Sequence, residues 1–136
     1  MDRAKILVVD DESRMRKLVR DFLVREGYNV LEAEDGVEAM DIFYEEKDIS
    51  LLILDVMMPR MNGLDAARII REMKRRDAMR VPIIAMSANA FAEDIINSRL
   101  AGMNAHLAKP LDAEKMIVAL KQCMADNRDI KLHEDL

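Results

Sequence analysis

Four short, largely apolar runs end in polar side chains, and this recurrence constrains the fold more than any other feature. The runs cover residues 6–9, 51–54, 83–86 and 105–108, and the polar residues that follow them are Asp10 and Asp11, Asp55, Ser87 and Lys109. Apolar runs of this length suit strands that are buried on both faces, as in a parallel sheet covered by helices. Ligands of such sheets bind at the carboxyl ends of the strands. If the runs are parallel neighbours, three carboxylates, a hydroxyl and an ammonium group converge on one crevice.

Helical spacing separates the predicted strands. A further strand is expected near residues 29–33, and each strand is followed by one helix. The first expected helix has Ser13 as N-cap and Gly27 as stop, and the second starts at Asp35. The third runs from Leu64 to about Arg76. The fourth runs from Phe91 to a stop at Gly102, and the last is capped by Asp112. Five strand–helix units joined by right-handed crossovers predict a three-layer α/β/α sandwich with five helices.

The composition is that of one domain in a reducing compartment. The chain has 136 residues, which suffice for one core. It contains no run of about 18 apolar residues, its first residues leave no room for a signal peptide, and Cys123 has no second cysteine to pair with. We therefore expect a cytoplasmic protein without a membrane span, with a domain over 1–125 and a polar C-terminal tail over 126–136.

The net charge of −5 argues against direct binding of nucleic acid, which requires a basic surface. A local basic segment interrupts this acidic balance between residues 60 and 80. Its cationic residues are Arg60, Arg68, Arg71, Lys74, Arg75, Arg76 and Arg80. A solvated helix face is the interpretation we favour, and a docking surface for an acidic partner is the alternative.

Three carboxylates in one crevice repel one another. At 4 Å and an effective dielectric constant near 20, one pair alone costs about 4 kcal/mol. Lys109 supplies one positive charge and cannot neutralise three carboxylates, so a divalent cation is expected. Oxygen ligands without histidine or cysteine select a hard ion, and few carboxylates with room for water favour Mg²⁺ over Ca²⁺.

Phosphoryl transfer is the chemistry that this set of groups suits best. We expect no histidine base beside Ser87 in the site, which argues against hydrolysis by a triad. A glycine-rich phosphate loop is also absent from the sequence. A carboxylate nucleophile flanked by a metal ion, a lysine and a hydroxyl can position and neutralise a phosphoryl group. Asp55 is the best acceptor, since it ends the strand expected at the centre and has no adjacent carboxylate. Asp10 and Asp11 would then hold the metal.

The chain resembles the receiver domain of two-component response regulators over about residues 4–124. Four motifs carry the resemblance, each at the end of an expected strand, and they cover residues 8–12, 54–63, 86–88 and 108–110. The second half is also similar to the receivers of hybrid sensor kinases. The resemblance implies a flavodoxin-like, doubly wound sheet of five parallel strands in the order 2-1-3-4-5.

The resemblance also implies a role for each matched residue. Asp55 would accept a phosphoryl group from a phosphohistidine on a sensor histidine kinase or histidine phosphotransfer protein. Asp11, Asp55 and the backbone carbonyl of Met57 would ligate Mg²⁺, with Asp10 acting through water. Ser87 and the Ala88 amide would bind the phosphoryl oxygens, with Lys109 as a further ion pair.

Other matched positions lie near the expected site. The Lys109–Pro110 bond is expected to be cis by the resemblance. Met57 and Asn89 match positions that tune dephosphorylation. Contacts with the phosphodonor are expected from Glu12, Arg14 and Met15 on the first helix.

His106 departs from the pattern of the family, which has an aromatic switch residue three positions before the lysine. A partly exposed histidine at a strand end, without a switching role, is one interpretation. A smaller rotameric switch is the other, and it could respond to pH because imidazole titrates near neutrality. Ser87 is the second position expected to take part in switching.

Three functions follow from these patterns. The leading hypothesis is a phosphoacceptor switch that changes its affinity for a downstream protein and is not an enzyme beyond its own phosphorylation and dephosphorylation. A Mg²⁺-dependent phosphohydrolase of the haloacid dehalogenase type is the runner-up, but it requires an aspartate two residues after the nucleophile, where this chain has Met57. A binding module without phosphorylation is the third. A start at Met1 slightly favours a free-standing protein over a fragment of a hybrid kinase.

Overall fold

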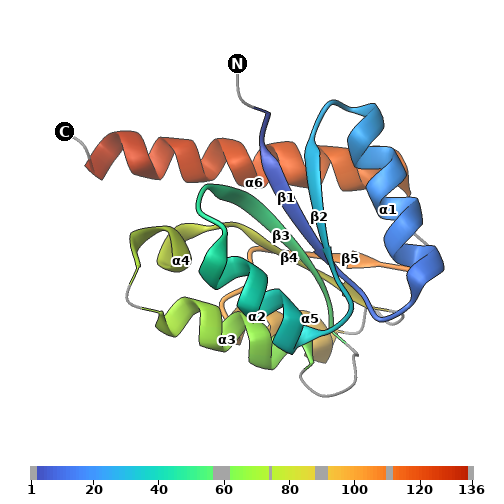
Figure 1. Ribbon diagram of the computed structural model, residues 1–136. Coiled ribbons are helices and arrows are strands. Elements are labelled where there is room, and N and C mark those ends of the chain that lie inside the picture. Colours follow the sequence, from blue (N-terminus) through green and yellow to red (C-terminus); the bar gives the residue numbers. More distant parts are fainter. Residues whose placement is uncertain (1–2, 57–61, 74, 88–91, 110–111, 135–136) are drawn as a thin grey trace.

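A computed structural model describes residues 3–56, 62–73, 75–87, 92–109 and 112–134. Within these ranges strands and helices alternate along the chain, except that helix α3 is followed directly by helix α4 (Figure 1). The strands are β1 (Lys5–Val9), β2 (Asn29–Ala33), β3 (Ile49–Asp55), β4 (Ile83–Ser87) and β5 (Ala105–Ala108). The helices are α1 (Ser13–Arg25), α2 (Gly36–Glu45), α3 (Gly63–Glu72), α4 (Arg76–Arg80), α5 (Ala92–Leu100) and α6 (Ala113–Glu134).

The strands form one parallel sheet in the order β2-β1-β3-β4-β5, which confirms the predicted sheet. In its register Val9 lies opposite Leu54, and Asp55 lies opposite Met86. Consequently β1, β3 and β4 end at the same edge of the sheet. The polar residues that follow the apolar runs are therefore brought to that edge, as parallel pairing requires.

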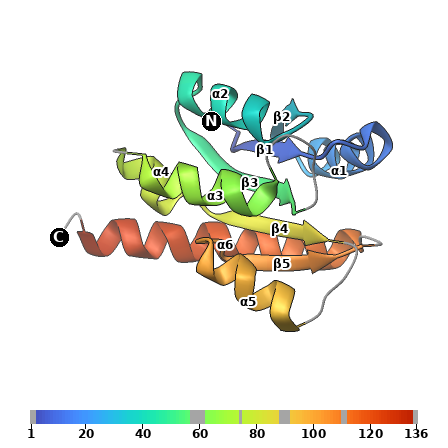
Figure 2. The same ribbon diagram turned by 90° about the horizontal axis from the view of Figure 1, so that it is seen from below.

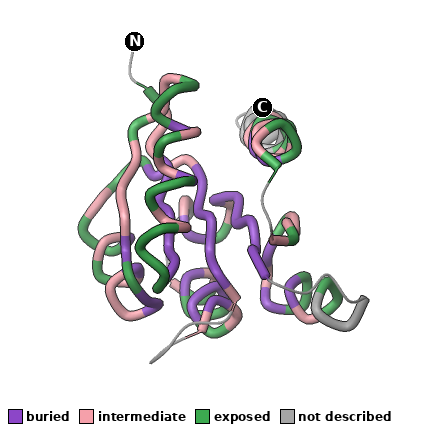
Figure 3. The backbone as a smooth tube through the Cα atoms, turned by 90° about the vertical axis from the view of Figure 1, so that its right-hand side faces the viewer, coloured by how far each residue is buried: buried purple, intermediate pink, exposed green. Residues whose placement is uncertain are grey.

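Two apolar clusters cover the two faces of the sheet. Side chains alternate between the faces along each strand, so that Leu52 and Leu54 pack on the side of α2, α3 and α4, whereas Leu51 and Ile53 pack on the side of α1 and α6. The strands run between these helices, and α5 lies beside the edge strand β5 (Figure 2). Buried residues accordingly follow the strands through the middle of the molecule (Figure 3).

Several helix ends follow the predicted capping residues. The side chain of Asp35 accepts a hydrogen bond from the amide of Glu38, and that of Asp112 accepts one from the amide of Glu114. Gly27 ends α1 with a φ of +92°, a conformation that glycine adopts without a steric penalty. The prediction of Ser13 as N-cap is wrong, since Glu12 precedes the first helical residue and makes no side-chain cap bond.

The prediction of one helix from Leu64 to about Arg76 is also wrong. Helix α3 ends at Glu72, Met73 has an extended backbone, and a separate five-residue helix α4 follows, so the described chain has six helices instead of five. The guanidinium of Arg75 donates to the backbone carbonyls of Phe43 and Tyr44 and lies 4.9 Å from the Phe43 ring centroid. These contacts with the end of α2 fix the position of the chain between α3 and α4.

Arg71 and Arg75 give the basic segment a structural role that the sequence did not reveal. The guanidinium of Arg71 donates to the carbonyls of Gly102 and Ala78 and to the side chain of Asn104. Its burial lowers the pKa of Arg71. Both arginines therefore join separate elements. For these two residues the interpretation of the basic segment as a solvated helix face is wrong.

Helix α6 continues to Glu134 and includes most of the segment that the sequence indicates as a polar tail. In its first half, Met116 and Leu120 are buried and pack on the sheet. Among the residues whose structure is described, none of the helices combines the length and apolar character needed to span a membrane.

Candidate functional site

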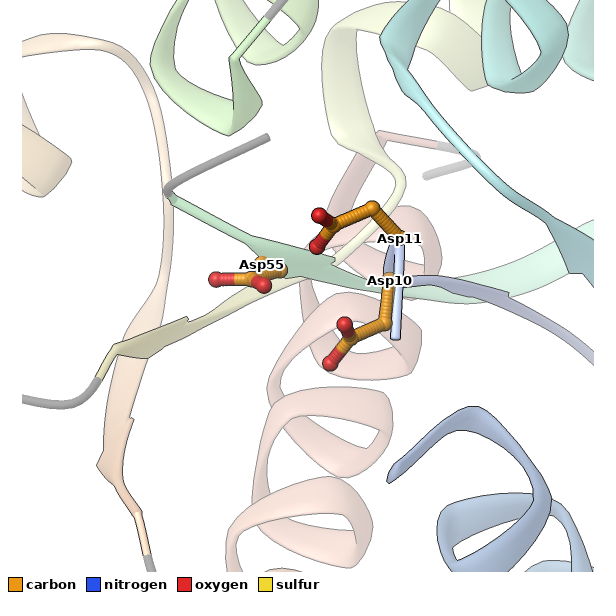
Figure 4. Close-up of side chains that lie close together, drawn as sticks. All are labelled: Asp10, Asp11 and Asp55. Atoms are coloured by element: carbon orange, nitrogen blue, oxygen red, sulfur yellow. The ribbon is translucent and has the colours of Figure 1, made fainter. Parts of the chain in front are cut away.

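Three carboxylates gather at the carboxyl edge of the sheet. Asp10 and Asp11 follow β1, and Asp55 is the last residue of β3 (Figure 4). One oxygen from each can be chosen so that all three lie within 4.8 Å of one another. Asp10 and Asp55 are buried, whereas Asp11 is exposed. The pairing of β1 with β3 thus joins residues that are more than forty positions apart in the sequence.

The turn that carries Asp10 is held by three hydrogen bonds. The amide of Asp10 donates to the carbonyl of Ala33 at 3.2 Å, and its Oδ1 atom accepts from the amide of Glu12 at 2.9 Å. The Nη1 atom of Arg16 donates to the carbonyl of Asp10 at 2.8 Å. Because Arg16 also pairs with Glu32 on β2, at 3.3 Å, the turn is braced against the neighbouring strand.

Close packing fixes the backbone of Asp55. The amide of Val56 donates to the carbonyl of Met86 on β4, and the amide of Gly63 donates to the carbonyl of Val56. A Cβ atom at position 63 would overlap the carbonyl oxygen of Asp55 and lie 3.0 Å from its carbonyl carbon. The first residue of α3 therefore has to be glycine for the chain to return so close to the end of β3.

Lys109 supplies the positive charge of the cluster. Its Nζ atom lies 3.3 Å from Oδ2 of Asp10 and 3.3 Å from Oδ2 of Asp55. Burial by itself would lower the pKa of the Lys109 ammonium group, but the negative charges of Asp10 and Asp55 and the hydrogen bond to Asp55 outweigh it, so that the pKa is raised. Lys109 is therefore protonated at neutral pH and bridges the two buried carboxylates.

The cluster fits a hard divalent cation. Its donors are carboxylate oxygens, without histidine or cysteine among the three residues. The Oδ2 atom of Asp10 is buried and has only the ion pair with Lys109, with no hydrogen bond within the described structure. One lysine balances one of the three negative charges, and a bound cation would neutralise the others.

Ser87 and His106 form a second polar group beside the carboxylates. Ser87 ends β4 and is buried, one residue beyond the register partner of Asp55. Its Oγ atom lies 2.9 Å from Nε2 of the half-buried His106 on β5, so the expectation that no histidine lies beside Ser87 is wrong. The amide of Lys109 donates to the carbonyl of Ser87 at 2.8 Å. The ends of β4 and β5 are thus joined through main chain and side chain together.

The structure brings together the predicted residues Asp10, Asp11, Asp55 and Lys109, and pairs Ser87 with His106. Four further residues that the sequence assigns to the site or its surroundings, namely Met57, Ala88, Asn89 and Pro110, lie outside the described residues. Arg60 and Lys74 of the basic segment and Phe91, the expected start of a helix, also lie outside them.

Sequence reasoning missed two residues that shape the site. Gly63 falls within the matched motif over residues 54–63 but has no role assigned to it there, although it stands eight residues after Asp55 and directly before the predicted helix. Arg16 lies one helical turn into α1, and its link to Glu32 depends on the pairing of β1 with β2. That pairing is not encoded by any local spacing.

Comparisons with known proteins agree on one family. The model of the response regulator receiver domain matches residues 6–121. The chemotaxis protein CheY homolog of Campylobacter jejuni is 41% identical over 107 residues, which are 78% of this chain and 81% of that protein. Chemotaxis protein CheY1 of Helicobacter pylori is 37% identical over 124 residues, covering 90% of this chain and 98% of that one.

A solved structure resembles the whole fold. The receiver domain of the sensor histidine kinase PA1611 from Pseudomonas aeruginosa superposes with a TM-score of 0.81 at 31% identity, covering 90% of this chain and 98% of that one. That structure has a magnesium ion coordinated in its active site cleft. The fold, the conjunction of three carboxylates with a lysine, and the relatives lead to one conclusion: this chain belongs to the response regulator receiver domain family.

Proposed function

We propose that this protein is a phosphoacceptor switch in which Asp55 takes a phosphoryl group from a phosphohistidine in a Mg²⁺-dependent reaction. The donor would be a sensor histidine kinase or a histidine phosphotransfer protein. The observation that supports this most is the convergence of Asp10, Asp11 and Asp55 within 4.8 Å, with Lys109 at 3.3 Å from Asp55. Receiver domains are phosphoacceptor switches, and the proposal assigns the acceptor within this one.

Asp55 is placed to act as the nucleophile. A carboxylate oxygen of Asp55 would attack the phosphorus, forming a P–O bond, while the P–N bond breaks and its electron pair remains on the imidazole of the donor. Asp55 is 4% exposed and is the last residue of β3, at the carboxyl edge of the sheet. Its fixed position reduces the entropy cost of reaching the phosphorus.

Neighbouring groups would neutralise the transferred phosphoryl group. Asp10, Asp11, Asp55 and the Met57 carbonyl would hold Mg²⁺, which supplies positive charge for the phosphoryl oxygens when it is bound. Lys109 is already paired with Asp55 and can extend that pairing to a phosphoryl oxygen. Ser87 and the Ala88 amide would donate hydrogen bonds to the remaining oxygens.

The output of the switch would be a change in protein binding. Phosphorylation would bias a pre-existing equilibrium in the positions of α5 and α6 and thereby change the affinity for a downstream protein. The bonds that Ser87 makes with His106 and Lys109 connect the proposed site to β5, which contacts both helices.

Small-molecule phosphorylation tests the proposal without the cognate kinase. The wild-type protein is incubated with acetyl phosphate and Mg²⁺, and the intact mass is measured. We expect one phosphoryl group on the wild type, none on Asp55→Asn, and none on the wild type when a chelator is present. Asp41→Asn is the matched control, because Asp41 is an exposed aspartate on α2 outside the site.

Two outcomes would overturn the assignment. Labelling of Asp55→Asn at the wild-type rate would show that another residue is the acceptor. Sustained release of phosphate from an external phosphomonoester, without accumulation of a phosphoprotein, would favour the phosphohydrolase instead.

A further inference from the structure

The contact between Ser87 and His106 has a chemical consequence for phosphoryl binding. The two side chains come from neighbouring strands and approach to 2.9 Å between Oγ and Nε2. His106 lies opposite Ala85 in the register, two residues before Ser87. Because side chains alternate along a strand, Ala85, Ser87 and His106 share one face of the sheet. The bond is therefore built into the pairing of β4 with β5.

A hydroxyl group has one proton to donate and two lone pairs that accept. If Ser87 donates its proton to Nε2, its oxygen presents lone pairs to any other group that approaches. If Nε2 carries a hydrogen and donates it to Oγ, the hydroxyl proton is available to a second acceptor. Phosphoryl oxygens are acceptors only, so just the second arrangement allows Ser87 to keep His106 and bind a phosphoryl group at once.

We propose that His106 is a positioning residue for phosphorylation: its Nε2–H donates to Ser87 Oγ and thereby directs the hydroxyl proton of Ser87 to a phosphoryl oxygen on Asp55. This inference rests on the function proposed above. His106 itself does not touch the phosphoryl group in this arrangement. It acts through Ser87, as a fixed partner and not as a side chain that has to rotate.

The surroundings of the pair support a fixed arrangement. Ser87 is 5% exposed and His106 is half-buried, so water competes little for their bond. The main-chain hydrogen bond from the amide of Lys109 to the carbonyl of Ser87 joins the ends of the same two strands. The side chain of Lys109 in turn reaches Asp55. The end of β5 therefore supplies both a charge to Asp55 and a partner to Ser87.

A double-mutant cycle tests whether His106 acts through Ser87. The rate of phosphorylation by acetyl phosphate at saturating Mg²⁺ is measured for the wild type, Ser87→Ala, His106→Leu, the double variant and His106→Gln. Ser87→Ala is expected to be roughly 10- to 100-fold slower and His106→Leu roughly 3- to 10-fold slower, as for loss of hydrogen bonds to a charged group. In the Ser87→Ala background His106→Leu should add no further loss. His106→Gln, which retains an amide donor, should restore most of the rate.

Equal slowing by His106→Leu with and without Ser87 would overturn the inference, as would a Gln variant as slow as the Leu variant. A wild type that takes no phosphoryl group, or an Asp55→Asn variant that does, would overturn the proposed function instead. The two failures are thus distinguishable.

The tautomer of His106 gives a second test that needs no change at position 106. The chain has two histidines, so in the variant His133→Gln the imidazole signals of the NMR spectrum come from His106 alone. Proton–nitrogen correlation spectra in the presence of acetyl phosphate and Mg²⁺ should show a hydrogen on Nε2. An imidazole with a hydrogen on Nδ1 alone would contradict the proposal.

Discussion

The two halves of the proposed site are built differently. The acidic half, with Asp10, Asp11 and Asp55, stands on β1 and β3, whose central residues are fully buried between helices. The other half, with Ser87, His106 and Lys109, includes the end of β5, a four-residue edge strand without a fully buried residue. The acidic half is braced by packing, whereas in the second half only Ser87 stands on a buried strand, β4, and the end of β5 is held by individual polar contacts.

This difference has a physical reason. Carboxylates that repel one another must be held by a rigid framework, and two strands buried on both faces provide it. An edge strand pairs with one neighbouring strand, so its movement breaks fewer contacts and costs less free energy. His106 and Lys109 therefore belong to the edge strand and its end, whereas Ser87 belongs to the buried strand β4.

The largest expected effect compares two leucines on the same face of the sheet. Leu51 on β3 is fully buried, and Leu107 on β5 is half-buried against the same cluster. Leu51→Ala should lower the free energy of unfolding by about 3–4 kcal/mol, as large-to-small core changes do, and Leu107→Ala by about 1–2 kcal/mol. Urea denaturation measures both. Equal losses would show that the edge strand is as firmly packed as the centre.

Glycine substitutions test the packing behind Asp55. Gly63→Ala would force the backbone of Asp55 or α3 to move, since the added Cβ overlaps the Asp55 carbonyl. We expect a loss of about 2–3 kcal/mol in stability, as for overpacking, and slower phosphorylation by acetyl phosphate. Gly27→Ala is the control: its added Cβ meets no atom within 4 Å, but its φ of +92° costs about 1 kcal/mol. Gly27→Ala should lose stability without slower phosphorylation. If it slowed phosphorylation as much as Gly63→Ala does, the slower rate of Gly63→Ala could not be assigned to the backbone of Asp55.

The smallest effect concerns the two arginines that pair with Glu32. Arg16 reaches both Glu32 and the carbonyl of Asp10, whereas Arg20 reaches Glu32 but has no bond to Asp10. Arg16→Gln should lower stability by about 1 kcal/mol and weaken Mg²⁺ binding a few-fold, because the Asp10 turn loses one hydrogen bond. Arg20→Gln should change stability by less than about 0.5 kcal/mol, as exposed ion pairs usually do. Thermal unfolding at increasing Mg²⁺ concentrations measures both stability and Mg²⁺ binding. If the two variants behaved alike, Arg16 would have no special role in holding the Asp10 turn.

The sequence alone predicted much of the sheet. The apolar runs place β1, β3, β4 and β5 within two residues of their observed bounds, because strands buried on both faces leave an uninterrupted apolar signal. Asp35, Asp112 and Gly27 were predicted as helix boundaries because capping depends on contacts a few residues apart. The break between α3 and α4 was not predicted, because it is tied to contacts of Arg75 with the distant end of α2.

For the site, residue types and their places at strand ends sufficed to select Asp10, Asp11, Asp55, Ser87 and Lys109. The sequence also singled out His106 as a departure from the family pattern, but it could not identify its partner. The 2.9 Å contact with Ser87, the brace by Arg16 and the approach of Gly63 to Asp55 exist only in the folded chain. Local patterning determines which residues reach the edge of the sheet, whereas strand register, which joins segments far apart in the chain, decides which of their atoms meet.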